Sequence, residues 1–356
     1  MKKVIVGMSG GVDSSVTALL LKKQGYDVTG VTLNIWQKKD ESNVCEKSCC
    51  GLEAVNDARK VCDKLDVPFY VFNFRDVFKE KVIDYFAAEY MKGRTPNPCN
   101  ACNKYVKFEA LLEKANSMGI EYIATGHYAK VDYNKDTGRY FLRKSVTLEK
   151  DQTYALYDLT QEQLKHLVMP LGDYTKPEVR KFAEEADLVN AKKTESQDIC
   201  FIENGKHDEF IKENYNYVPK QGNFVWKDGK TLGKHQGLIR YTVGQRKGLG
   251  IGFGKPVYVT KLDTAKNQVV LGDLEDLFSK ELIAINVNLM TIEKLTSPLK
   301  VEAKIRYSAK PAKATLYPIE DNNIRVVFDE EQKSITPGQA VVFYDDDIVV
   351  GGGIIK

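Results

Sequence analysis

The chain has 356 residues, 43% of them hydrophobic and 28% charged, with a formal net charge of +3. This length predicts two or three domains. The small net charge permits a polyanionic partner but excludes a strongly basic protein that binds nucleic acid through charge alone. No apolar run approaches the roughly 18 residues of a membrane helix, and the N-terminus lacks a signal-peptide layout, so we expect a cytoplasmic protein with no membrane partner.

The first half of the chain alternates strand and helix patterns. Apolar strands are predicted at residues 2–8, 26–36, 67–74 and 120–128, with amphipathic helical patterns between them. A capping box, "TKPE" at 175–178, opens a further helix. Strands separated by helices indicate right-handed crossovers, so residues 1–204 are predicted to form a doubly wound α/β domain with a parallel sheet.

The pattern changes after residue 204. Residues 205–275 are rich in Gly, Lys and aromatic residues with short strand patterns, which predicts a small β-rich module. Residues 276–356 contain short strands at turn-bounded intervals, which favours an all-β sandwich or barrel. We expect a C-terminal antiparallel β-barrel.

The stretch "GMSGGVDSS", residues 7–15, follows the first predicted strand and opens the first helix. Its glycines permit a tight turn whose N–H groups, together with the helix N-terminus, form a site for phosphate. The loop is neither a Walker A motif nor a dinucleotide fingerprint. The plain structural alternative is a glycine-rich turn with an N-capping Ser or Asp.

The loop resembles the pyrophosphatase-type loop of ATP enzymes that cleave between the α and β phosphates and transfer AMP to an oxygen. This resemblance implies ATP and Mg²⁺ binding by a continuous run of residues: Gly7, Met8, Ser9, Gly10, Gly11, Val12, Asp13 and Ser14. The loop alone does not identify the acceptor of the adenylate.

Seven cysteines in a chain able to build large cores argue against a disulfide framework. Cys99 and Cys102 form a close pair in "TPNPCNACN", which by itself suits zinc, a thiol redox pair, an iron cluster or sulfur handled as a substrate. Cys45, Cys49 and Cys50 suggest a metal site, but no fourth ligand follows at finger-like spacing.

Further stretches narrow the function: "ATGHYA", "SQDICFI", "KDQTYALYDL", "GQRKGLGI", "KIRYSAKPAKATLYP" and "PGQAVVFY". With the loop and the cysteine pair, they make the whole chain resemble the tRNA-specific 2-thiouridylase family. The resemblance implies a tRNA-uridine 2-sulfurtransferase that adenylates the 2-oxygen of the wobble uridine. Cys200 would carry a persulfide received from a cysteine desulfurase or a sulfur-relay protein. Cys102 would assist sulfur transfer and close a Cys102–Cys200 disulfide.

The same resemblance assigns binding roles. Leu33 and Gly126 would line the nucleotide site, and Asn97, Pro98 and Cys99 would contact the target base. The residues implied to contact tRNA are His127, Lys150, Asp151, Gln152, Arg306, Tyr307 and Gln339.

Strand alternation in "KVEAKIRYSAK" gives weaker, independent support for RNA binding. It predicts one basic face with Lys304, Arg306, Ser308 and Lys310, and an opposite face with Val301, Ala303, Ile305 and Tyr307. An ordinary solvated strand face is the alternative to an RNA surface.

Two questions stay open at this point. Many relatives carry Asp where this chain has Cys99, and with Cys102 and Cys200 a third thiol could hold a 4Fe-4S cluster. The alternatives to the thiolase as a whole are a synthetase that adenylates a small molecule and a non-catalytic tRNA-binding protein.

Overall fold

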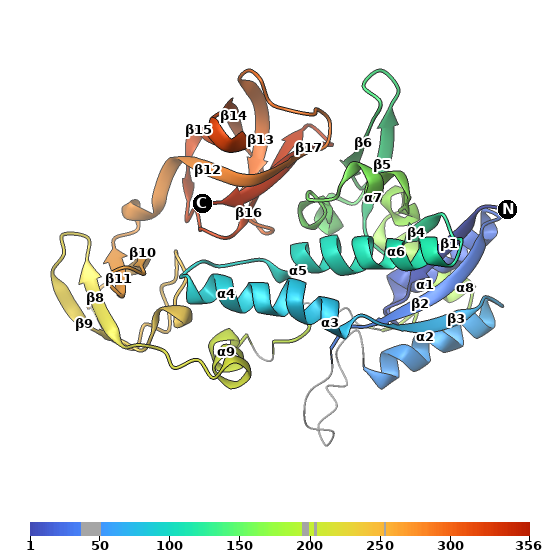
Figure 1. Cartoon of the computed structure of the whole chain (residues 1–356), viewed down its shortest axis with the longest axis horizontal. Coiled ribbons are helices and arrows are strands. Elements are labelled where there is room, and N and C mark those ends of the chain that lie inside the picture. The colour runs from blue at the N-terminus through green and yellow to red at the C-terminus, as the bar shows by residue number, and fades with distance from the viewer. Residues whose placement is uncertain (37–50, 194–198, 203–204, 253) are drawn as a thin grey trace.

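The computed structural model describes residues 1–36, 51–193, 199–202, 205–252 and 254–356, which fold into three parts (Figure 1). The first part contains a parallel sheet of five strands in the order β3-β2-β1-β4-β7. The strands are β1 (Lys3–Gly7), β2 (Asp27–Asn34), β3 (Phe69–Asn73), β4 (Tyr122–Ala124) and β7 (Leu167–Val168). The predicted doubly wound α/β domain is therefore confirmed.

Both faces of this sheet are buried. Ile5 belongs to one hydrophobic cluster, whereas its neighbours Val4 and Val6 belong to another, as expected when successive side chains of a strand point to opposite faces. The helices of this part are α1 (Val12–Lys23), α2 (Leu52–Lys64), α3 (Arg75–Phe78), η1 (Lys79–Asp84), α4 (Tyr85–Met91), α5 (Pro98–Ala101), η2 (Cys102–Ala110), α6 (Leu111–Ser117), η3 (Leu148–Lys150), η4 (Thr153–Ala155), α7 (Gln161–Lys165), η5 (Pro170–Asp173) and α8 (Lys176–Glu185).

The order of the strands places the switch point of the sheet between β1 and β4. β1 pairs with β2 on one side and with β4 on the other, so the connections that leave β1 and β4 diverge at their carboxyl ends. Open parallel sheets bind ligands at such a switch point. The phosphate loop follows β1, and Gly126 follows β4.

The central module follows α9 (His207–Tyr215) and contains a mixed sheet in the order β10-β11-β8-β9. Its elements are β8 (Gly222–Trp226), β9 (Thr231–His235), η6 (Leu238–Arg240), β10 (Tyr258–Asp263) and β11 (Gln268–Gly272). Phe224, Val259 and Leu271 are fully buried in its core. This agrees with the small β-rich module expected from the sequence.

The C-terminal part is a closed antiparallel barrel, because β12 pairs with both β15 and β17. Its elements are η7 (Glu275–Leu277), β12 (Phe278–Leu289), β13 (Leu299–Lys304), β14 (Ala312–Pro318), η8 (Glu320–Asn322), β15 (Ile324–Lys333), β16 (Ala340–Asp345) and β17 (Ile348–Ile355). The predicted antiparallel β-barrel is confirmed.

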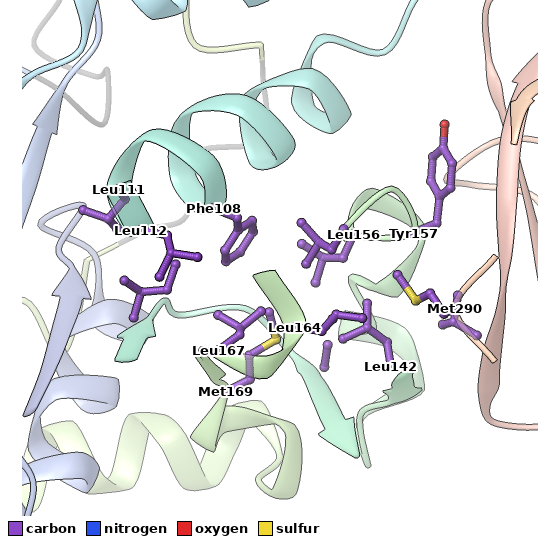
Figure 2. Packing of buried hydrophobic residues seen from close by; sticks show 14 of the residues in the cluster. Phe108, Leu111, Leu112, Leu142, Leu156, Tyr157, Leu164, Leu167, Met169 and Met290 are labelled. Atoms are coloured by element: carbon purple, nitrogen blue, oxygen red, sulfur yellow. The ribbon is translucent and has the colours of Figure 1, made fainter. Parts of the chain in front are cut away.

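The first part and the barrel share a sheet and a core. A hairpin of the first part, β5 (Ala129–Asn134) and β6 (Arg139–Lys144), joins the barrel sheet where Arg143 pairs with Ile348. In Figure 2, Phe108, Leu164 and Leu142 of the first part pack in the same cluster as Met290, which follows β12. The two parts are thus joined by a continuous hydrophobic interface.

The exact domain limits proposed from the sequence stay predictions. The first limit falls beside residues 203–204, which lie outside the described residues, and the second falls within η7. Within the described residues, no helix combines the length and the apolar character needed to cross a bilayer.

Candidate functional site

The phosphate loop lies between the end of β1 and the start of α1. Gly10 has a φ of 70°, and a Cβ added there would collide with the carbonyl oxygen of Ala54. Glycine is therefore required both by the left-handed backbone and by the close approach of α2. Gly11 is the N-cap residue of α1 and has no side chain to satisfy the first N–H groups of the helix, which suits an anionic ligand.

Hydrogen bonds fix the shape of this loop from within. Ser14 Oγ accepts from the backbone N–H of Ser9 at 3.2 Å and donates to the carbonyl of Gly11 at 3.1 Å. Asn190 Nδ2 donates to the carbonyl of Gly10 at 3.1 Å and to Ser15 Oγ at 2.8 Å. Asn190 and Ser15, which were not predicted from the sequence, support the loop through these hydrogen bonds.

The other two residues assigned to ATP also lie at the carboxyl edge of the sheet. A Cβ added at Gly126 would lie 2.7 Å from the backbone nitrogen of Ser14, so the end of β4 is packed directly against the start of α1. Leu33 is the penultimate residue of β2, the other neighbour of β1. The structure thus brings Leu33, Gly126 and the loop to adjacent strand ends.

An ion pair crosses the loop and was not predicted from the sequence. Lys176 Nζ lies 2.6 Å from Oδ1 and 2.8 Å from Oδ2 of Asp13, and Tyr128 donates its hydroxyl to Asp13 Oδ1 at 2.8 Å. Lys176 is only 8% exposed, although it is the first residue of α8. The capping box identified the start of this helix, but nothing in it signalled that its lysine turns inward.

His127 lies next to Gly126 and is 9% exposed. Its Nδ1 is 2.7 Å from Thr125 Oγ1, and its ring packs against Phe108 at 5.7 Å between centroids. Desolvation by burial, with a smaller contribution from the positive charge of Lys107, holds the pKa of His127 well below its ordinary value. The imidazole is therefore neutral at physiological pH.

The cysteine pair lies on a helix that begins at α5 and continues into η2. Asn97 is the N-cap residue of α5 and accepts from the backbone N–H of Cys99 at 3.0 Å, while Pro98 occupies the first turn. Cys99 and Cys102 are three residues apart and thus on one side of the helix, with Cys99 exposed and Cys102 buried. The positive end of a helix dipole stabilises negative charge at this position.

Cys102 and Cys200 belong to the same hydrophobic cluster. Cys102 is one of the buried members of this cluster, and the half-buried Cys200 packs against the cluster. The neighbouring Phe201 is also a buried member, and its ring lies 5.3 Å from that of Phe86. Cys99 is not a member of this cluster. The fold thus places these two residues, 98 positions apart in the sequence, in one hydrophobic cluster.

The alternative of a 4Fe-4S cluster on Cys99, Cys102 and Cys200 stays a hypothesis. Among the described residues, no group of three or more His, Cys, Asp or Glu side chains is arranged so that it could hold a metal ion. Cys45, Cys49 and Cys50 lie outside the described residues. Cys62 is fully buried, and desolvation raises the pKa of its thiol to about 12, so it has the properties of a core residue.

The segment Lys150–Gln152 is linked to the phosphate loop through Tyr128. Gln152 Oε1 accepts from the backbone N–H of Tyr128 at 2.9 Å, and the N–H of Gln152 donates to the carbonyl of Tyr128 at 3.1 Å. Asp151 is 8% exposed and accepts from the N–H of Ser145, and burial raises its pKa. Gln152 and Tyr128 thus connect the segment expected to contact tRNA with Asp13.

The strand alternation predicted around Tyr307 was wrong at its end. Val301, Ala303 and Ile305 are buried on one side, but Tyr307, predicted to share their face, is 49% exposed, because it lies beyond the end of β13 at Lys304. The Nζ of Lys304 lies 5.3 Å from the centre of the Tyr307 ring, which is a cation–π distance. Arg306 donates to the carbonyl of Lys333 at 2.9 Å. Tyr307 thus lies on the barrel surface, where its ring also makes an edge contact with Tyr154 at 6.1 Å between centroids.

Gln339, the remaining residue assigned to tRNA, contacts the segment before α5. We call the helix formed by α5 and η2, which carries Cys99 and Cys102, the cysteine helix. Its Nε2 donates to the carbonyl of Thr95 at 2.8 Å. Thr95 lies two residues before Asn97, the cap of α5. This contact between the barrel and the cysteine segment had no signal in the sequence.

Family models match the chain in the same three-part order. The model described as "tRNA methyl transferase HUP domain" matches residues 2–204. A "tRNA methyl transferase PRC-barrel domain" matches residues 208–273, and an "Aminomethyltransferase beta-barrel domain" matches residues 279–355.

Full-length relatives carry a more specific name. A "tRNA-specific 2-thiouridylase MnmA" of Acetivibrio thermocellus is 58% identical over 356 residues, covering 100% of this chain and 99% of the relative. The protein of the same name from Clostridioides difficile is 56% identical over 355 residues, covering 100% and 98%. Among solved structures, a 4-thiouridine synthetase–RNA complex with bound ATP matches with a TM-score of 0.37 and 17% identity, covering 56% of this chain and 45% of that chain.

Proposed function

The chain belongs to the family of tRNA-specific 2-thiouridylases, and on this premise we propose that it uses ATP to replace the 2-oxygen of the wobble uridine of tRNA with sulfur. The observation that carries the proposal is that one α/β domain presents a phosphate loop at its switch point and packs Cys102 and Cys200 in one cluster. The first feature suits activation of an oxygen, and the second suits delivery of sulfur.

In the first step, the uracil 2-oxygen attacks the α-phosphorus of ATP, and the bond between the α-phosphorus and the bridging oxygen to the β phosphate breaks. Pyrophosphate leaves, and AMP stays on the uracil oxygen. Residues Ser9–Ser14 would hold the phosphates through the loop N–H groups and the N-terminus of α1. This step converts a poor leaving group into AMP.

Asp13 fits the role of a Mg²⁺ ligand, because it is a carboxylate at the phosphate loop and Mg²⁺ is bound through one or two carboxylates together with substrate phosphates. When bound, Mg²⁺ would neutralise phosphate charge. Lys176 would then be released from its pair with Asp13 and bind a phosphate oxygen instead. The neutral His127 adds no positive charge beside this site.

In the second step, sulfur enters. A cysteine desulfurase or a sulfur-relay protein would load Cys200 with a persulfide. The Cys102 thiolate would attack the Cys200 sulfur, releasing hydrosulfide and forming the Cys102–Cys200 disulfide. Hydrosulfide then attacks C2 of the adenylated uracil, and AMP leaves with the original oxygen. Cellular thiols reduce the disulfide and supply the two electrons that restore both cysteines.

The alternative function, a synthetase that adenylates a small metabolite, can be distinguished from tRNA thiolation by testing whether pyrophosphate release depends on RNA. Purified protein is mixed with ATP and Mg²⁺, with or without unmodified tRNA, and released pyrophosphate is measured. We expect release only when tRNA is present. Release that needs a metabolite and ignores tRNA would overturn the proposal.

The roles of the two steps are separated by Cys200→Ser. This variant should still release pyrophosphate with tRNA, but it should form no 2-thiouridine from a persulfide donor. Cys62→Ala is the matched control, because Cys62 is a core thiol outside the cluster of Cys102 and Cys200, and it should retain both steps. If Cys200→Ser also stops pyrophosphate release, the assignment of Cys200 to sulfur delivery is wrong.

A further inference from the structure

The short segment Gly93–Thr95 connects α4 to the cysteine helix and contacts both β-modules. The N–H of Thr95 donates to the carbonyl of Pro337 at 2.8 Å, and the carbonyl of Thr95 accepts from Gln339 Nε2 at 2.8 Å. Both backbone groups of Thr95 are therefore bound by the barrel. Figure 1 shows the barrel lying over α4 and α5, where this segment runs.

The fit between the barrel turn and this segment is close. Gly338 has a φ of 92°, and a Cβ added there would lie 2.8 Å from the nitrogen of Thr95. Arg94 Nη2 donates to the carbonyl of Ile355 at 3.0 Å, close to the C-terminus of the barrel. A larger residue at Gly338 would therefore push the segment away from the barrel.

The central module touches the same segment from another direction. Thr95 Oγ1 lies 3.3 Å from Thr242 Oγ1, and a Cβ added at Gly93 would lie 2.7 Å from Thr264 Cγ2. All three parts of the chain thus meet immediately before the cysteine helix. A shift of the central module or of the barrel would therefore change the contacts of Thr95.

The chain between Thr95 and the cysteines is stiff. Pro96 and Pro98 each fix φ and restrict the residue before them, and Asn97 between them is held by its cap to Cys99. Cys99 follows Thr95 by four residues, and Cys102 follows by seven. The position of Thr95 therefore determines the orientation of the first turn of the cysteine helix, because the residues between them have little conformational freedom.

We propose that Gln339 is a positioning residue for the sulfur step: by binding Thr95 it fixes the cysteine helix against the barrel, so that Cys102 meets its targets in the correct geometry. This inference rests on the proposed thiolation and deepens it. It differs from a direct contact between Gln339 and tRNA, because Gln339 acts through Thr95 and Cys102 rather than through RNA affinity.

The test compares Gln339→Met, which keeps the length of the side chain and removes the donor, with Gln332→Met. Gln332 is the matched control because its amide donates to the carbonyl of Glu330 within its own strand. For each protein, the kcat and the KM for tRNA are measured for 2-thiouridine formation, and the rate of tRNA-dependent pyrophosphate release is measured separately.

Gln339→Met should lower the kcat for 2-thiouridine by about 10-fold to 100-fold, because small misplacements of reacting groups have effects of this size. The KM for tRNA and the rate of pyrophosphate release should stay within about twofold of the wild type. Amide exchange at Thr95 should become faster in the same variant, and Gln332→Met should change none of these values.

A rise in KM for tRNA with an unchanged kcat would overturn the inference and indicate a direct RNA contact. Since removal of an interdomain contact can weaken the fold, Gln339→Asn is measured as well: it keeps the amide but is too short to reach Thr95. A stable Gln339→Asn with the wild-type kcat would also overturn the inference. A wild-type protein that forms no 2-thiouridine would overturn the proposed function itself, and with it this role of Gln339.

Discussion

Lys176 Nζ lies within 2.8 Å of both carboxylate oxygens of Asp13, although 163 residues separate the two in the sequence. A buried ammonium group needs a negative partner, because desolvation of an unpaired charge is costly. Asp13 supplies that partner when no nucleotide is bound. The phosphates of ATP carry negative charge that could replace the Asp13 carboxylate as the partner of Lys176. Asp13 and the nucleotide would therefore compete for the Lys176 ammonium group.

Lys176→Met should therefore impair the adenylation step. Loss of the ammonium group removes a charged donor from the phosphate site, and tRNA-dependent pyrophosphate release should fall by about 100-fold or more. Lys181→Met on the same helix is the control, since Lys181 is exposed and pairs with Glu185 on the surface. An unchanged rate in Lys176→Met would mean that the pair with Asp13 is only structural.

Tyr128→Phe should have a smaller effect on the same step. The substitution keeps the buried ring and removes the hydroxyl that donates to Asp13, a hydrogen bond to a charged group worth about 1.5–3 kcal/mol. Pyrophosphate release should fall by roughly tenfold or more. Tyr133→Phe, at an exposed position of the β5–β6 hairpin, should have no effect. Equal rates for the two variants would show that the hydroxyl of Tyr128 does not orient Asp13 during the reaction.

His127 should make the folded state less stable as the pH falls. Its pKa is lowered in the folded protein, so the unfolded chain binds the proton first, and stability that is present above the unfolded pKa of about 6.5 is lost below it. Between pH 7.5 and 5.5 the wild type should lose about 1 kcal/mol more free energy of unfolding than His127→Gln. Urea unfolding at the two pH values measures the difference; parallel losses in both proteins would show that His127 is not held neutral.

The described thiols should differ in their rates of alkylation. Burial raises the pKa of Cys62 to about 12, so very little of this thiol is thiolate at pH 8, and its side chain is closed to solvent, whereas Cys99 is exposed. Iodoacetamide treatment of the native protein, followed by peptide mass analysis, should modify Cys99 first and Cys62 last. The half-buried Cys200 should fall between them. Rapid modification of Cys62 in the native protein would contradict its place in the core.

The fold was predictable where local patterns carry the information. The apolar run at residues 2–8 and the helical pattern that follows predict a buried parallel strand, and the glycine at position 10 is explained by a left-handed turn under close packing. The phosphate loop could be found for the same reason, since its chemistry is contained in a few consecutive residues.

Other features depend on contacts between distant segments. Nothing local indicates that Lys176 turns toward Asp13, because the two meet only after α8 packs against α1. Gln339 binds Thr95 only after the barrel packs against the first part. The strand face predicted for Tyr307 was wrong for a different reason: alternation applies only within a strand, and β13 ends three residues earlier. Cys102 and Cys200 were paired through resemblance to a family, and their common cluster is a property of the fold.

The central claim is tested most directly by nucleoside analysis of tRNA after reaction. The purified chain is incubated anaerobically with ATP, Mg²⁺, a persulfide donor and unmodified tRNA, and the digested RNA is examined by mass spectrometry, with Cys200→Ser in a parallel reaction. The account predicts 2-thiouridine at the wobble position with the wild type and none with the variant. Wild-type protein that binds tRNA and hydrolyses ATP under these conditions, yet leaves the uridine unmodified, would contradict it.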